Sequence, residues 1–170
     1  MERTGCLVIH GGECAYLRAT AARLRTCSVA IVETDLKSDS ENAALDGLRR
    51  ARRADGTAIL ASGEAIWFAL ALAARMNVDK LALIEPRSAR DANARAMESF
   101  ARRNLFFCVS DALIVESRPG GASERIYRKM LNSRVWRLNS DGEEAMNWVV
   151  RFLTCENWLD CEPEKREKFV

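Results

Sequence analysis

The sequence predicts a single α/β domain, in which a mostly parallel sheet of about six strands carries helices on both faces as a three-layer sandwich. Short apolar runs without polar alternation recur along the chain, and such runs are typical of strands buried on both faces. Longer segments with helical periodicity separate these runs. The 170 residues are 48% hydrophobic and 29% charged, which is the composition of one globular domain and not of a disordered chain.

The predicted strands are rich in aliphatic and β-branched residues and are bounded by polar or glycine-containing segments. They are Cys6–Ile9, Val29–Glu33, Thr57–Ala61, Lys80–Ile84, Ala112–Val115 and Arg134–Leu138. Because helical segments alternate with these strands, we expect crossover connections within one sheet.

The predicted helices are Cys14–Arg25, Glu41–Arg53, Ala65–Met76, Ala89–Arg103, a helix capped by Ser123 and a helix that begins at Asp141. Apolar side chains surround Ala65–Met76 on all sides, which indicates a helix buried on most of its surface. Residues 1–170 therefore form one predicted domain, with a charged tail from about residue 160 to 170.

Charge and composition exclude several classes of function. The 26 basic and 24 acidic residues give a net charge of +2, too small to recruit nucleic acid or an anionic membrane. One histidine and six cysteines without a CxxC pair do not form the pattern of a zinc site, and no sequence feature indicates a metal or a cofactor. Residues 1–6 lack a basic segment followed by an apolar one, so we expect a reduced, cytoplasmic protein.

Three segments, in chain order, resemble the α/β-hydrolase family. Cys6–Gly12, with its His-Gly-Gly end, resembles the strand and turn that donate a backbone N–H to the oxyanion hole in that family. Val29–Asp35 resembles the next strand, and Ala58–Ala65 resembles the strand, elbow and helix that carry G-x-S-x-G. The resemblance covers roughly residues 5–155 and implies an α/β-hydrolase-like fold with a minimal lid, or none, beyond residues 88–103.

The catalytic positions of that family are not filled. Gly63 stands where the family has its nucleophilic serine, and glycine tolerates the strained backbone of that turn. The loop after Val115 offers Glu116 where an aspartate is usual, and residues 139–142 contain no histidine. Without an imidazole base, a serine hydroxyl is a poor nucleophile, so we do not expect standard serine hydrolase activity.

The candidate ligand pocket consists of the residues at the two resembling turns: His10, Gly11, Gly12, Ser62, Gly63 and Glu64. Each reactive side chain has a structural interpretation, which we favour, beside a catalytic one. Ser62 caps the following helix or is a displaced nucleophile. His10 shapes its turn or is a general base paired with Glu33 or Glu64. Cys6 packs in the core or is a thiol nucleophile, and Glu116 is the substitute acid.

We therefore expect a non-catalytic or cryptic hydrolase-like domain, a pseudoenzyme that binds a small molecule or a protein partner. Glu13 and Glu64 place carboxylates beside the turns, which favours a neutral or amine-bearing ligand over a phosphate. One alternative is a hydrolase of a small ester or acyl substrate that uses Ser62 or Cys6. The other is a homo-oligomerisation module, in which Trp158 contributes to a homodimer interface.

Overall fold

A computed structural model describes residues 4–11, 15–36, 41–52, 56–88, 90, 95–96, 98–99, 103, 109–118, 120–130 and 133–155. Within them the chain forms a six-stranded sheet in the order β2-β1-β3-β4-β5-β6. The strands are β1 (Thr4–His10), β2 (Val29–Asp35), β3 (Thr57–Ser62), β4 (Val78–Ile84), β5 (Val109–Glu116) and β6 (Arg134–Asn139). Every neighbouring pair is parallel. Each predicted strand is confirmed, and the predicted α/β class holds.

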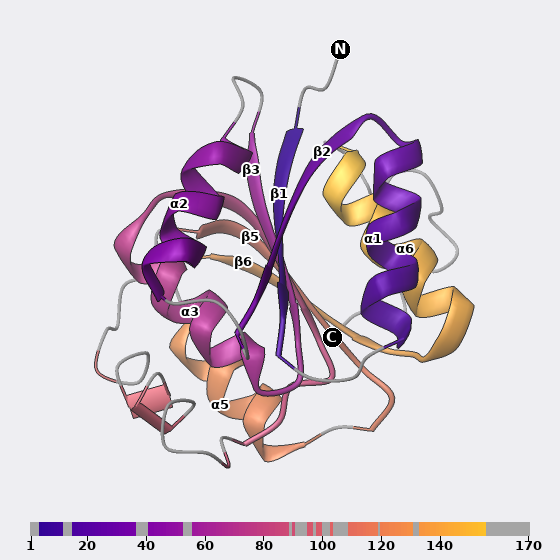
Figure 1. The fold of residues 1–170 in the computed structure, drawn as a ribbon. Coiled ribbons are helices and arrows are strands. Elements are labelled where there is room, and N and C mark those ends of the chain that lie inside the picture. Colours follow the sequence, from indigo (N-terminus) through magenta and orange to yellow (C-terminus); the bar gives the residue numbers. More distant parts are fainter. Residues whose placement is uncertain are drawn as a thin grey trace.

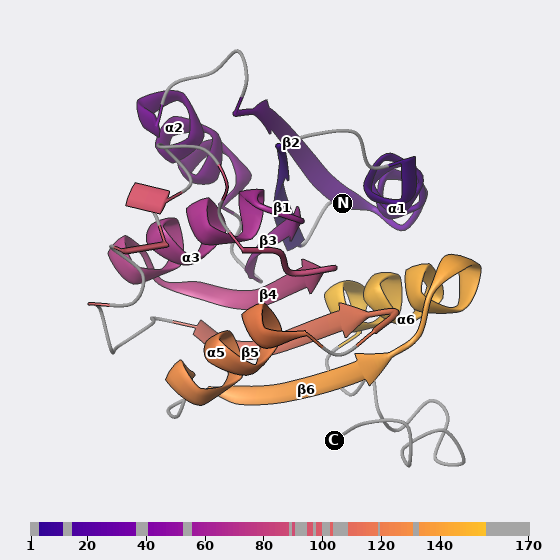
Figure 2. The same cartoon turned by 90° about the horizontal axis from the view of Figure 1, so that it is seen from below.

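Helices cover both faces of the sheet (Figures 1 and 2). The described helices are α1 (Ala15–Thr26), α2 (Glu41–Ala51), α3 (Ala65–Arg75), α5 (Gly121–Lys129) and α6 (Gly142–Thr154). The first and last of these lie on one face, while α2, α3 and α5 lie on the other. The predicted helix Ala89–Arg103, the segment available for a lid and the charged tail fall mostly or wholly outside the described residues.

Strand alternation divides the core into two apolar clusters, one on each face. Leu7 and Ile9 of β1 join the cluster beneath α2, α3 and α5, whereas Cys6 and Val8 join the cluster beneath α1 and α6. The prediction that α3 is buried is confirmed, since its buried residues follow one another around the helix. No helix in the described part of the chain is long and apolar enough to cross a membrane.

The start of α5 differs from the prediction. The N-cap position of α5 is Gly120, so the predicted cap at Ser123 is wrong. Ser123 lies in the first turn of the helix, fully buried, and its hydroxyl oxygen lies 2.8 Å from both the carbonyl oxygen of Gly120 and a carboxylate oxygen of Glu116, so its one proton is shared between these two acceptors. Ser123 therefore serves as a hydrogen-bond partner of Glu116, the buried carboxylate at the end of the preceding strand.

Candidate functional site at the carboxyl ends of β1 and β3

The strand order places a topological switch between β1 and β3. Strand β1 has β2 on one side and β3 on the other, and the helices that connect these strands, α1 and α2, lie on opposite faces. Ligands of open α/β sheets bind outside the carboxyl ends of the strands at such a switch. Ile9 pairs with Ala61, so the next residues, His10 and Ser62, end the two strands side by side.

Gly63 forms the turn that follows β3. Its φ is +60°, in the left-handed region that favours glycine, as the sequence predicts for an elbow residue. The turn is held by the neighbouring strand and loop: the Gly63 N–H donates to the carbonyl of Ile84 at 3.0 Å, and its carbonyl accepts from the Arg87 N–H at 3.4 Å. A Cβ atom built on Gly63 meets no atom within 4 Å, so the position faces open space.

Ser62 does not cap α3. It is the last residue of β3, whereas the N-cap position is Glu64 and no side chain makes a capping hydrogen bond there. The cap prediction is wrong because Gly63 turns the backbone between the strand and the helix. The Ser62 residue is 8% exposed, and no hydrogen bond among the described residues involves its hydroxyl.

Gly11 brings the end of β1 against the start of α3. A Cβ atom on Gly11 would lie 2.7 Å from the Cβ of Ala65, a distance that real side chains do not adopt. Glycine at this position therefore lets the backbone after β1 approach the N-terminal turn of α3, where unsatisfied N–H groups are found. Gly12, Glu13 and Cys14 lie outside the described residues.

His10 has a carboxylate partner on the adjacent strand. Its Nε2 lies 3.3 Å from Oε1 of Glu33, and the other oxygen of Glu33 accepts from Arg25 at 2.8 Å. Of the two partners that the sequence suggests for His10, the structure brings Glu33 to it. Because a carboxylate accepts hydrogen bonds, Nε2 carries the proton in the neutral ring and Nδ1 is left as an acceptor.

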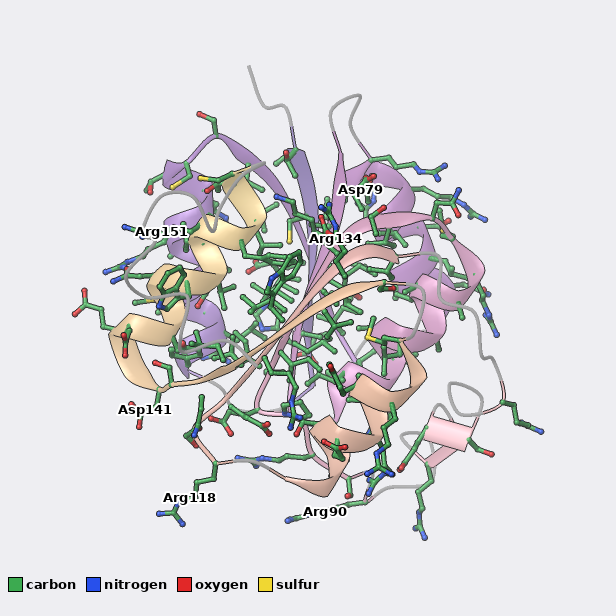
Figure 3. The ribbon with its side chains drawn as sticks, turned by 180° about the vertical axis from the view of Figure 1, so that it is seen from behind. Asp79, Arg90, Arg118, Arg134, Asp141 and Arg151 are labelled. Atoms are coloured by element: carbon green, nitrogen blue, oxygen red, sulfur yellow. The ribbon has the colours of Figure 1, made fainter. Side chains whose placement is uncertain are left out.

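Charged groups also surround the turn at the start of α3. Oε1 of Glu64 lies 4.0 Å from the guanidinium of Arg90. Sequence reasoning missed Glu85, which follows β4 with a φ of +49° and accepts a hydrogen bond from the Ser117 N–H at 2.6 Å. Only its place after a predicted strand could have indicated it. Arg90 and Arg118 lie at the same end of the molecule as Asp141 (Figure 3).

Glu116 is not brought to His10. On β5 it continues the row of Ala112 and Ile114, which belong to the cluster under α2, α3 and α5, whereas His10 continues the row of Cys6 and Val8 on the opposite face. Besides Ser123, the guanidinium of Arg137 contacts its carboxylate at 3.4 Å. These contacts compensate a buried charge and account for Glu116 without a catalytic role.

The Cys6 thiol is enclosed in the sheet. The residue is fully buried, and burial raises the pKa of its thiol to about 12, so it is protonated at neutral pH. A protonated, enclosed thiol is neither a nucleophile nor a metal ligand. Among the residues that the structure describes, no group of three or more histidine, cysteine, aspartate and glutamate side chains could hold a metal ion.

Comparison of the sequence with protein families and with curated proteins found no significant match. The assignment of a function therefore depends on the geometry of the carboxyl ends of β1 and β3.

Proposed function

We propose that this chain is an α/β-hydrolase-like domain, a three-layer sandwich without the serine hydrolase triad, which binds a small molecule or a protein segment at the carboxyl ends of β1 and β3. The observation that carries the proposal is Gly63, whose positive φ fits an elbow and whose missing side chain leaves open space. The close approach of Gly11 to Ala65 supports a retained backbone frame of the kind that surrounds an oxyanion hole.

The side chains around this frame support binding more than catalysis. Glu116 is engaged with Ser123 and Arg137 on the other face of the sheet, and the only histidine of the chain ends β1. In a triad the nucleophile is hydrogen-bonded to the base, and the base is hydrogen-bonded to the acid. The positions that carry these three residues in the family supply none of them here.

The proposal is tested by nuclear magnetic resonance with the full chain. Titration with a panel of small neutral amides and esters is expected to shift the backbone amides of Gly11, Gly63 and Ala65 while most other amides stay in place. The same preparation is expected to hydrolyse p-nitrophenyl acetate at the background rate. Turnover well above background that is lost in Ser62→Ala would overturn the proposal.

A second candidate is a hydrolase with Ser62 as its nucleophile, and the contact between His10 and Glu33 favours it. In this scheme Nδ1 of His10 takes the proton of the Ser62 hydroxyl as Oγ attacks an acyl carbon, and Glu33 stabilises the resulting imidazolium. Labelling with a fluorophosphonate tests the scheme, because a modified Ser62 peptide in the parent and none in His10→Phe would establish it. An unlabelled parent leaves the binding proposal.

A further inference from the structure

We propose that His10 selects the ligand of this site: its Nδ1 accepts a hydrogen bond from an N–H group of a neutral, amide-bearing molecule, with the Ser62 hydroxyl as the second contact. The inference rests on the proposed function and names the class of ligand that the site takes. It follows from the tautomer of one imidazole, from a hydroxyl at the end of the neighbouring strand that has no partner among the described residues, and from the charges nearby.

The tautomer is set by the strand pairing. Val8 pairs with Glu33, so the glutamate side chain stands diagonally across from His10 on the same face of the sheet. The contact of 3.3 Å between Nε2 and Oε1 needs the proton on Nε2. The other ring nitrogen, Nδ1, then carries no proton in the neutral ring and has no partner among the described residues. It can therefore accept a hydrogen bond from a ligand.

Ser62 ends β3, the strand next to β1, one residue beyond the pair of Ile9 and Ala61. It continues the row of Ala58 and Leu60, which belong to the same apolar cluster as Cys6 and Val8, so its side chain and that of His10 project from one face. More than nine tenths of the residue is buried, and its hydroxyl lacks a partner within the described part of the chain. A ligand that bonds to this hydroxyl adds a partner that the described residues do not supply.

The charges near the site favour a neutral ligand over an ion. Glu33 is paired with Arg25, and Glu64 lies within 4.0 Å of Arg90. Each of these two carboxylates therefore has a cation beside it, so neither Glu33 nor Glu64 is left as an uncompensated charge that would bind an ion. Discrimination then depends on hydrogen bonds, and an amide supplies both the N–H that Nδ1 accepts and a carbonyl that the Ser62 hydroxyl can reach.

The free protein gives the first test, because the chain contains one histidine. Long-range ¹H–¹⁵N correlation spectra show its two ring nitrogens without overlap. At a pH at which the ring is neutral, we expect the proton on Nε2 in the parent and in Arg25→Ala, and a mixture of tautomers in Glu33→Ala. A proton found on Nδ1 in the parent overturns the inference.

The second test uses two probes that differ in one group. N-methylbenzamide carries an N–H where methyl benzoate carries an oxygen, and the two have nearly the same shape. We expect the amide to bind about two- to tenfold more tightly, the range that one hydrogen bond supplies, and to shift Nδ1 of His10. The preference is expected to persist in Arg25→Ala, the control, and to disappear in Glu33→Ala.

The outcomes separate this inference from the proposed function. If both probes shift the Gly63 amide with equal affinity, the inference is overturned and binding at the turn stands. If neither probe shifts the Gly63 amide or the His10 ring, both are overturned. If Glu33→Ala keeps the preference for the amide, the Glu33 carboxylate does not keep Nδ1 of His10 unprotonated as an acceptor, and the inference fails.

Discussion

At the scale of single residues, two glycines allow the effect of backbone conformation to be isolated. Gly63 has a φ of +60°, whereas Gly120 at the start of α5 has a φ of −136°, and a Cβ atom on either meets open space. Replacement by serine therefore adds the same atoms to both positions without a clash. Only at Gly63 does the added side chain oppose the backbone conformation.

Gly63→Ser is expected to lower the free energy of unfolding by about 1 kcal/mol and to create no esterase activity. Gly120→Ser is expected to leave stability unchanged or slightly higher, since serine is a favoured N-cap residue. Urea unfolding followed by circular dichroism measures both. Equal stability of Gly63→Ser and the parent would show that the backbone after β3 does not hold the positive φ.

Because the Cys6 thiol is buried, we expect the free energy of unfolding to depend on pH in the alkaline range. Burial raises the pKa of this thiol from 9.0 to about 12. Above pH 9 the unfolded chain releases this proton while the folded chain keeps it, so the unfolded state binds fewer protons and stability falls as the pH rises. The contribution is complete below pH 9 and is lost progressively toward pH 12, by at most about 1.4 kcal/mol per pH unit.

Urea unfolding at about pH 8 and about pH 10 checks this sign. The parent is expected to lose roughly 1 kcal/mol more between these conditions than Cys6→Ala, which lacks the thiol. The variant also loses packing, but that loss is the same at both pH values. A parent and a variant with parallel pH dependence would mean that the thiol is not desolvated.

Residue roles were only partly predictable from the sequence. The positive φ of Gly63 followed from its place in a strand–turn–helix segment, which is local information. The sequence left the partner of His10 open between Glu33 and Glu64, because the choice depends on the register of two parallel strands. Ser62 was misassigned as a cap since the sequence does not show that the turn takes up both Gly63 and Glu64 before the helix begins.

At the scale of an element, the side chain of Lys80 forms hydrogen bonds that link the end of α6 to the sheet. The Nζ of Lys80, on β4, donates to the carbonyl oxygens of Phe152 at 2.6 Å and of Cys155 at 2.7 Å. These carbonyls belong to the C-terminal turn of the helix, where intrahelical donors are lacking and the helix dipole favours a cation. Sequence patterns predicted both elements but not this link between distant segments.

Lys80→Met is therefore expected to destabilise the domain by about 1.5–3 kcal/mol, because methionine keeps the apolar stem and removes a charged donor of two hydrogen bonds. Arg49→Met is the control, since its partner Asp46 is exposed and such pairs contribute about 0–1 kcal/mol. Thermal or urea unfolding compares the two. If both substitutions lowered the free energy of unfolding equally, Lys80 would contribute no more to stability than an exposed ion pair does.

At the scale of the whole molecule, the fold was predictable because its signal is repeated. Each strand independently shows an apolar run, and the burial of both faces follows from the absence of polar alternation in those runs. The order of the strands and the pairing of side chains across them carry no such repeated signal. The class of the fold was therefore evident in the sequence, whereas the contacts that distinguish binding from catalysis needed the structure.

The two apolar clusters share one sheet, so we expect them to unfold together. Ile59 on β3 packs in the cluster under α2, α3 and α5, and Ile84 on β4 packs in the cluster under α1 and α6. Replacement of either isoleucine by valine is expected to cost about 0.5–1.5 kcal/mol. The costs should add in the double variant, because side chains on opposite faces of the sheet share no partner.

Urea unfolding followed by tryptophan fluorescence and by far-ultraviolet circular dichroism tests this cooperativity. Coincident curves are expected in the parent and in all three variants, since neither cluster can lose its packing without exposing the strands that the other covers. Curves that separate in Ile84→Val but not in Ile59→Val would show that α1 and α6 detach first. In that case His10 and Glu33, which lie on the α1 and α6 face, would lose their contact before the sheet unfolds.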